Sequence, residues 1–416
     1  MRHRRQNPRR GHHRELQGPH RLRAAGRGAV SAAPRGERAL KFSIVIPYKQ
    51  RLDNIRLALA SLAEQTLDAD EFEVIVGAME YAPEFTEACR EFAGRLRLTA
   101  VHSAADWQVG LARNLALRQA TGEIVVCLDA DMILPPDCLS TLYERYYAYG
   151  QRVCVAGQMI DYDNNADDVT SVTVHPFAHY RETLAALSEG GGARSDPRLS
   201  AEHVIPWAYA WTAFVAVPRV LAEEHGLTFD LAFTGYGVED LEWAYRIART
   251  GTPIVMAPEV WGVHLPHLRN VAANRETERR NYRYFVGKWP EYDVELAAAF
   301  GDFEANGLAR EYRAALREAA GAPGLSLAAV RGSVQGEETL FLGALSDGRG
   351  VPKDVGALLD TGAPHEVLPL AGLALPYEDG AFAECRVLAP VTRLPDRYLD
   401  AVLAEAGRVA RAVRRD

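Results

Sequence analysis

Residues 122–134 read GEIVVCLDADMIL, and the expected fold follows from this segment. Five apolar, mostly β-branched residues, Ile124 to Leu128, are followed by two carboxylates, Asp129 and Asp131. A short apolar run of this kind is typical of a buried parallel strand. The carboxylates then lie at its C-terminal end, where open α/β sheets bind ligands. Two such oxygen ligands suit Mg²⁺ or Mn²⁺ holding a diphosphate, although an acidic strand-to-loop turn gives the same pattern.

The composition is that of a globular protein. The chain has 416 residues, of which 48% are hydrophobic and 25% charged, so we expect a large domain plus an appendage, or two domains. The five cysteines form no CxxC pair, which argues against a zinc site or a disulfide framework and favours a reducing cytoplasm. Because no run of 18 apolar residues occurs, no transmembrane helix is expected.

The first 38 residues differ from the rest in charge. They contain 11 Arg and only two acids, Glu15 and Glu37, whereas the whole chain carries a net charge of −8. A basic arm of this kind is typical of segments that bind nucleic acid or an anionic membrane. A start codon assigned too far upstream would also produce such a segment. We interpret residues 1–40 as a disordered basic leader, since they lack an apolar run to fold around. We expect no nucleic-acid partner and leave peripheral membrane contact open.

From Phe42 onward, predicted strands alternate with predicted helices. The strands cover residues 42–46, 72–76, 98–101 and 124–128, and the helices between them cover residues 54–65, 83–96 and 109–119. Strands that follow one another about every 25–30 residues with helices between them indicate right-handed βαβ units. The expected fold class is therefore α/β, a mostly parallel sheet flanked by helices.

Beyond residue 134 the pattern is less regular. Loops are predicted over 161–168 and 188–197, strands over 210–217 and 253–256, and helices over 239–249 and within 270–320. A Gly/Pro break at residues 321–324 opens the last segment, 321–416, which we expect to be a small α/β appendage.

Four further segments carry polar residues next to predicted strands or helices. They are SIVIPYKQR (43–51), QVGLARN (108–114), GYGVEDLE (235–242) and GVHLPH (262–267). Together their order and spacing resemble the family-2 glycosyltransferases of GT-A fold. Segment 235–242 resembles in particular the C-terminal half of galactosyltransferases and chondroitin polymerases.

The resemblance covers residues 41–290 and implies a domain organisation. The GT-A domain would span residues 41–320, with a nucleotide-binding half (41–134), an acceptor-binding half (135–290) and a helical tail (291–320). The appendage at 321–416 would serve acceptor binding or dimer contact, and the sequence leaves both open.

The resemblance also implies a metal-dependent inverting transfer of a sugar. The donor would be a nucleotide sugar, with a UDP-sugar as first candidate, and the acceptor a hydroxyl of a glycan, natural product or peptide. Mn²⁺ or Mg²⁺ held by Asp131 would neutralise the leaving diphosphate, with Asp129 nearer the ribose or in the outer metal shell. His264 would complete the metal shell, as the matching histidine does in the family, and His267 is the weaker candidate.

Two acids open the predicted helix 239–249. Asp240 is the candidate general base, because the helix dipole favours its ionised form, and Glu239 would bind the acceptor sugar. Capping of the helix N-terminus is the structural alternative for both. In the glycine loop before the helix, Tyr236 and Gly237 are expected to contact the acceptor, since glycine allows close approach of the backbone.

The nucleotide would lie against the loop after the first strand. Pro47, Tyr48 and Arg51 are expected to line this site, with Tyr48 against the base or ribose and Arg51 near phosphate. Arg113 and Asn114 would brace the loop, or form a helix salt bridge or cap instead.

Aromatic residues and a missing acid complete the set of candidates. Trp207, Tyr209 and Trp211 alternate with period two, which predicts one face of a strand, serving as a platform for a sugar ring or as core packing. Family members usually carry an acidic pair after the second strand that contacts the nucleobase. Only Glu80 remains acidic here, which leaves the donor base open.

Two other classes of protein share parts of this pattern. A nucleotidyltransferase needs a glycine-rich phosphate loop directly after the first strand, and residues 47–51 contain no glycine. A non-catalytic sugar-binding relative is expected to have lost the catalytic and metal-binding acids. This sequence retains all four of them: Asp129, Asp131, Glu239 and Asp240.

Overall fold

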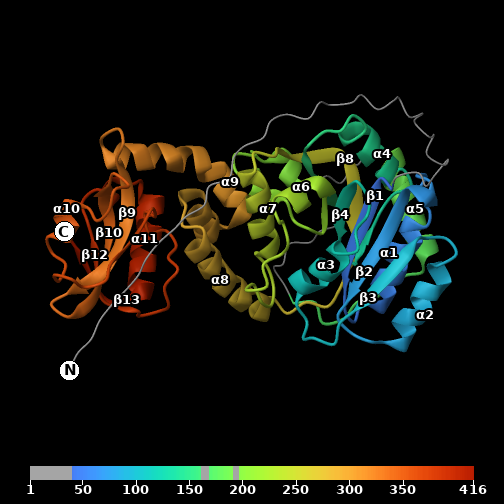
Figure 1. The fold of residues 1–416 in the computed structure, drawn as a ribbon, viewed down its shortest axis with the longest axis horizontal. Coiled ribbons are helices and arrows are strands. Elements are labelled where there is room, and N and C mark those ends of the chain that lie inside the picture. Colours follow the sequence, from blue (N-terminus) through green and yellow to red (C-terminus); the bar gives the residue numbers. More distant parts are fainter. Residues whose placement is uncertain (1–39, 161–167, 191–195) are drawn as a thin grey trace, which may run out of the picture. The chain divides into compact units, whose positions relative to one another are not determined.

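The computed structural model describes residues 40–160, 168–190 and 196–416 (Figure 1). The predicted basic leader and most of the loops predicted at 161–168 and 188–197 lie outside the described residues. Among the described helices, none has both the length and the apolar character needed to cross a membrane.

The first half of the main sheet has the predicted βαβ organisation. Its strands are parallel to one another in the order β3-β2-β1-β4, and Val45 pairs with both Ile75 and Cys127. Every residue of β1 and β4 is buried, as expected for strands covered on both faces. The elements are β1 (Phe42–Tyr48), α1 (Leu52–Leu62), β2 (Phe72–Ala78), α2 (Pro83–Phe92), β3 (Leu98–His102), α3 (Val109–Leu117) and β4 (Ile124–Leu128).

Four more strands make the sheet mixed. They are β5 (Met132–Ile133), β6 (Cys154–Ile160), β7 (Phe214–Pro218) and β8 (Ile254–His264), and the full order is β3-β2-β1-β4-β7-β6-β8-β5. β7 runs antiparallel to β4 and β6, β5 runs antiparallel to β8, and the other pairs are parallel. The expected fold class, an α/β sheet that is mainly parallel and flanked by helices, is confirmed.

Two predicted strands differ from the observed ones. The strand predicted at 210–217 begins only at Phe214, because the chain turns just before it and the backbone N–H of Phe214 donates to the carbonyl oxygen of Trp211 over 3.3 Å. The strand predicted at 253–256 continues to His264, so this histidine is the last residue of β8 and does not lie beyond the strand.

The helices of the second half end close to their predicted limits. Helix α7 (Glu239–Arg249) has the predicted bounds, and the predicted helical region 270–320 contains α8 (Val271–Lys288) and α9 (Tyr292–Ala320). Helix α9 is kinked at Gly301, whose φ of 77° lies in the left-handed region. The remaining helices are α4 (Cys138–Tyr146), α5 (Phe177–Glu189) and α6 (Arg219–Glu224).

The C-terminal segment forms a second, smaller sheet, as expected for an α/β appendage. The strand order is β11-β9-β10-β12-β13. β9 and β10 are joined by Gln335 and Gly336, whose φ values of 54° and 82° fit a type I′ hairpin turn. The elements are β9 (Ser326–Val334), β10 (Glu337–Ser346), α10 (Lys353–Gly356), β11 (Glu366–Leu368), β12 (Phe382–Val387), α11 (Asp396–Val409) and β13 (Ala410–Arg415).

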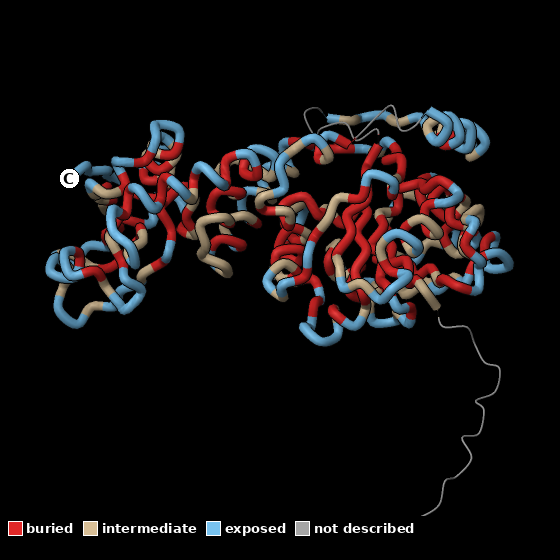
Figure 2. Tube along the Cα trace, turned by 90° about the horizontal axis from the view of Figure 1, so that it is seen from above, coloured by how far each residue is buried: buried red, intermediate tan, exposed pale blue. Residues whose placement is uncertain are grey.

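One apolar core runs through both sheets. Buried residues follow the strands of each sheet in Figure 2. A single cluster of buried side chains contains Val215 of the main sheet, Tyr312 of α9 and both Leu342 and Tyr398 of the C-terminal region. The C-terminal sheet is therefore packed against the helical tail and shares its hydrophobic core.

Candidate functional site

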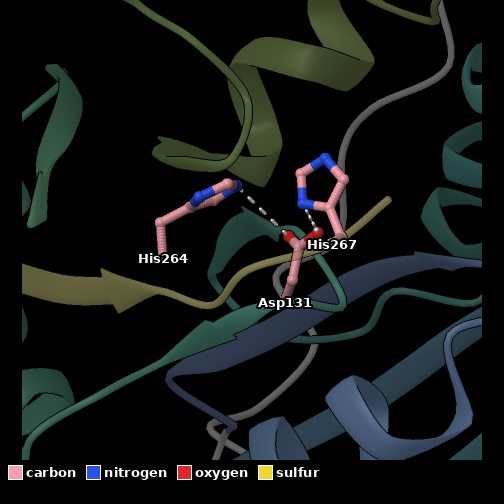
Figure 3. A group of neighbouring side chains, drawn as sticks. All are labelled: Asp131, His264 and His267. Carbon is pink, nitrogen blue, oxygen red and sulfur yellow. Dashed lines mark ion pairs between the residues drawn. The ribbon is translucent and has the colours of Figure 1, made fainter. Parts of the chain in front are cut away.

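The metal candidates meet where β5 pairs with the end of β8 (Figure 3). Met132 is opposite His264 in this antiparallel pair, which brings Asp131 beside His264. The chain then turns so that His267 faces the same carboxylate: Nδ1 of His267 is 3.1 Å from Asp131 Oδ2, and Nε2 of His264 is 3.8 Å from Oδ1. One ligand atom from each of the three residues lies within 4.8 Å of the others.

This set of donors fits a divalent ion. Oδ1 of Asp131 is buried and has no hydrogen-bond partner among the described residues. Burial alone would raise the pKa of Asp131, but His264, His267 and Arg51 together hold that pKa well below its usual range. Burial lowers the pKa of His264, which favours the neutral imidazole that binds metals. One carboxylate and two imidazoles suit Mn²⁺ better than Mg²⁺, which prefers oxygen ligands.

Asp129 lies apart from this cluster, because Arg113 holds it. Arg113 donates to Asp129 over 3.0 Å and to Glu239 over 2.9 Å, and its side chain is buried between the two carboxylates. The expectation that Asp129 ligates the metal directly is therefore not supported by the geometry of the described residues. The alternative for Asp129, an outer-shell or ribose role, stays a prediction.

A strained loop positions the first turn of α7. Gly235 and Gly237 have φ values of 79° and 85°, and Val238 has a φ of 74°, which is costly for a β-branched residue. The side chain of Asn281 donates to the carbonyl oxygens of Tyr236 (3.3 Å) and Gly237 (2.9 Å) and so fixes the loop from α8. Strain of this kind is typical of functional sites.

Asp240 has the environment of a general base. The helix dipole favours its ionised form, but burial and the neighbouring Glu239 carboxylate outweigh the dipole and raise the pKa of Asp240 to about 7. A base works best when its pKa is near the working pH. Glu239 is already bound to Arg113, so it is oriented before any ligand arrives.

A single cavity of about 1680 Å³ connects these groups. It is lined by most of the residues predicted from the sequence, namely Pro47, Arg51, Arg113, Asp129, Asp131, Trp211, Tyr236, Gly237, Glu239, Asp240, His264 and His267. Arg51, on the loop after β1, forms an ion pair with Asp131.

Part of the chain that lines this cavity is similar to known proteins. Residues 43–193 match the family model described as Glycosyl transferase family 2. Residues 43–193 are therefore similar to the family 2 glycosyltransferases, and this match covers less than half of the chain. It is similar to validoxylamine A glucosyltransferase of Streptomyces hygroscopicus subsp. jinggangensis (strain 5008), with 28% identity over 280 residues, 65% of this chain and 64% of that protein. The chain thus spans slightly less than two thirds of this relative.

Two further proteins are similar to this chain. The uncharacterized glycosyltransferase YfnE of Bacillus subtilis (strain 168) is 24% identical over 293 residues, covering 62% of this chain and 74% of that protein. Among solved structures, the mannosyltransferase PcManGT from Pyrobaculum calidifontis in complex with GDP-Man and Mn²⁺ aligns with a TM-score of 0.45 and 22% identity. That alignment covers 69% of this chain and 77% of the other.

Three residues predicted for the glycosyltransferase site belong to the core. Tyr48 is buried and stacks on Phe85 with ring centroids 4.1 Å apart, so it does not line the cavity. Trp207 and Tyr209 are buried in the 3-10 turn that Pro206 starts, which breaks the predicted period-two strand. Trp211 alone of the three aromatic residues reaches the cavity.

Asn114, one of the two residues predicted to brace the loop after β1, contacts a different segment. Asn114 exchanges two hydrogen bonds of 2.8 Å with the backbone of Phe229, so it does not brace the loop after β1. That loop is held by Glu80, which accepts a hydrogen bond of 2.8 Å from the backbone N–H of Gln50 and lies outside the cavity lining.

The sequence patterns missed the far end of the cavity. Glu278 and Tyr282 of α8 and Asp302 of α9 line it, as do residues of the C-terminal sheet region. Asp302 accepts a hydrogen bond of 2.9 Å from the indole N–H of Trp211. Its position depends on the kink at Gly301, and a glycine within a helical pattern was the only signal for it in the sequence.

Proposed function

We propose that the protein is a metal-dependent inverting glycosyltransferase that uses a nucleotide-sugar donor. The observation that carries this proposal is the shared cavity, which contains both the Asp131–His264–His267 cluster and the carboxylate of Asp240. A diphosphate leaving group needs positive charge, which a metal ion bound by the cluster would supply. A hydroxyl nucleophile needs a base to accept its proton, which is the role of the Asp240 carboxylate.

At the donor end, the side chains prepare a site for negative charge. A divalent ion, when held by Asp131 and the two histidines, supplies the positive charge that the departing diphosphate needs. Arg51 lies at the same carboxylate and is 41% exposed, so its guanidinium is free to turn toward phosphate oxygens. Asp129 beside this site remains the candidate for the ribose.

At the acceptor end, Asp240 takes the proton of the attacking hydroxyl. The bond from the acceptor oxygen to the anomeric carbon forms as the bond from that carbon to the diphosphate breaks. The proton passes to Asp240, and the electron pair of the broken bond leaves on the diphosphate. Displacement in one step inverts the anomeric carbon. Glu239, which Arg113 orients, accepts a hydrogen bond from the acceptor in this proposal.

The identities of donor and acceptor are finer proposals. The name of the Streptomyces relative favours glucose as the transferred sugar and a small natural product as the acceptor. Uracil as the base, and the likeness of segment 235–242 to galactosyltransferases and chondroitin polymerases, stay predictions.

A donor panel tests the proposed function. The full-length protein would be incubated with UDP-, GDP- and dTDP-sugars and Mn²⁺, and the products identified. We expect one sugar nucleotide to release a nucleoside diphosphate, and EDTA to stop the release. Release of pyrophosphate would indicate a nucleotidyltransferase, and turnover undiminished by EDTA would exclude the metal.

A further inference from the structure

The cavity is larger than a donor requires. Sites for one small ligand typically span about 300–1,000 Å³, whereas this cavity has about 1680 Å³. One end holds the metal candidates. The opposite end is lined by α8, by the kink of α9 and by C-terminal residues, among them Leu375, Ala404 and Arg408. The space at this opposite end is therefore available to an acceptor larger than one sugar ring.

The C-terminal residues that line this end of the cavity form one wall of it, and Arg408 of α11 holds that wall together. Its guanidinium donates to the carbonyl oxygens of Leu375 (3.2 Å) and Tyr377 (2.7 Å) and to the Asp379 carboxylate (2.8 Å). Glu405, one turn earlier in α11, accepts a hydrogen bond of 2.7 Å from the backbone N–H of Leu375. The loop at 375–379 is thus fixed on α11, and its side of the cavity is preformed.

A buried carboxylate joins this wall to the helical tail. Glu295 of α9 accepts hydrogen bonds from the backbone N–H groups of Ala371 (2.8 Å), Gly372 (3.0 Å) and Leu373 (3.2 Å). Seven residues later, the same helix presents Asp302 to the cavity beside Trp211. The C-terminal region and the transferase domain therefore build one continuous surface.

The charge of this end restricts what it can bind. Six carboxylates line it: Asp240, Glu276, Glu278, Asp302, Asp379 and Glu405. The three guanidinium groups there, of Arg279, Arg283 and Arg408, each pair with an acid. Among the described residues, Asp240, Glu278 and Asp302 form no ion pair. A surface with unpaired carboxylates repels an anionic ligand and accepts hydrogen bonds from hydroxyl or ammonium groups.

We propose that the C-terminal region is the outer wall of the acceptor site, and that the acceptor is a polyhydroxylated molecule of more than one ring that carries no negative charge. This inference rests on the proposed function, since it assigns the acceptor of the same cavity. It gives residues 321–416 a role in acceptor selection rather than in catalysis.

A pair of tryptophan substitutions on α11 tests the wall. Ala404 is exposed and lines the cavity, whereas Asp400, also exposed and one turn earlier, does not. For Ala404→Trp we expect kcat/KM for a two-ring acceptor to fall about tenfold or more, because the added ring fills the acceptor end. Donor hydrolysis and transfer to glucose should stay within about twofold of wild type. Asp400→Trp should change none of these, and the melting temperature of both variants reports folding.

The charge is tested with three dimers as acceptors: cellobiose, the glucosamine dimer and the galacturonic acid dimer. We expect transfer to one or both of the first two and not to the third. Preference for the galacturonic acid dimer, transfer to none of the three while donor hydrolysis continues, or equal effects of the two tryptophans would overturn the inference. Absence of donor hydrolysis in wild type would instead contradict the proposed function itself.

Discussion

Arg113 and Glu239 form a buried ion pair, 2.9 Å long, that joins α3 to the first turn of α7 across 126 residues of sequence. The second arm of the same guanidinium binds Asp129 at the end of β4. One acid predicted for the donor site and one acid predicted for the acceptor site are therefore held by the same cation. Its position fixes Glu239, and through it the start of the helix that carries Asp240.

Replacement of Arg113 should cost both stability and activity. Removing one partner of a buried ion pair typically destabilises a protein by about 3–5 kcal/mol, because a buried charge is left unpaired. Arg113→Met should lower the melting temperature strongly. Arg113→Lys should recover only part of the loss, since an ammonium cannot bond both carboxylates as the planar fork does. A methionine variant that unfolds at the wild-type urea concentration would contradict the pairing.

Metal binding should depend on all three residues of the Asp131 cluster. Asp131→Ala should abolish Mn²⁺ binding, measured by calorimetry or by loss of the free-ion electron paramagnetic resonance signal, while the fold persists. His267→Ala should weaken binding as clearly as His264→Ala, although the sequence ranks His267 lower. The control is His225→Ala, because His225 is exposed and lies outside the cavity. Full Mn²⁺ affinity in His267→Ala would restrict the site to Asp131 and His264.

Asp240→Asn should separate catalysis from donor binding. The asparagine keeps the size of the side chain but cannot accept a proton, and loss of a general base typically costs about 10²–10⁴-fold in rate. Donor affinity in the presence of Mn²⁺ should stay near wild type, because the diphosphate site lies on other strands. Glu239→Gln should instead raise the KM for the acceptor. Near-normal turnover in Asp240→Asn would move the base to Glu239.

The same residue predicts a pH profile. The pKa of Asp240 is raised to about 7, so the ionised base is scarce below that pH and predominates above it. The rate of transfer should therefore rise with pH through about 7 and level off above. In a variant with Asn at this position, the residual rate should lose this rise, which distinguishes Asp240 from any other group that titrates in the same range.

Glu295 should contribute strongly to stability although it lies outside the catalytic groups. Its carboxylate accepts from three backbone N–H groups and from the hydroxyl of Tyr312 at 2.6 Å. A glutamine offers one oxygen, so Glu295→Gln leaves buried donors unpaired at about 1–3 kcal/mol each. Glu291→Gln is the matched control, because Glu291 pairs with Arg249 at the surface and should change stability by no more than about 0.5 kcal/mol. Equal urea midpoints for the two variants would argue against a structural role for Glu295.

Removal of residues 1–39 should leave donor turnover unchanged. The arm is rich in Arg, Gly, His and Pro and offers no apolar surface for a fold. A shortened protein that folds but no longer turns over the donor would show that the arm takes part in catalysis.

The parts of the fold and site that depend on local pattern can be predicted from the sequence. The alternation of apolar strands with amphipathic helices predicted β1 to β4 and the helices between them, because hydrophobic period is a property of neighbouring residues. The carboxylates at the end of β4 and the acids that open α7 were found in the same way, since strand ends and helix starts carry local signals.

Which of these residues contact one another depends on the long-range packing of the chain. His267 joins Asp131 because β5 pairs with β8 across about 130 residues, and Arg113 meets Glu239 through contacts equally remote in sequence. Trp207 and Tyr209 turned inward because one proline replaced a strand by a 3-10 turn. The acceptor wall depends on a kink at Gly301 and on Glu295, whose partners lie 76 to 78 residues away. Such contacts are set by the order and register of the strands, and the hydrophobic periodicity of a short segment does not predict them.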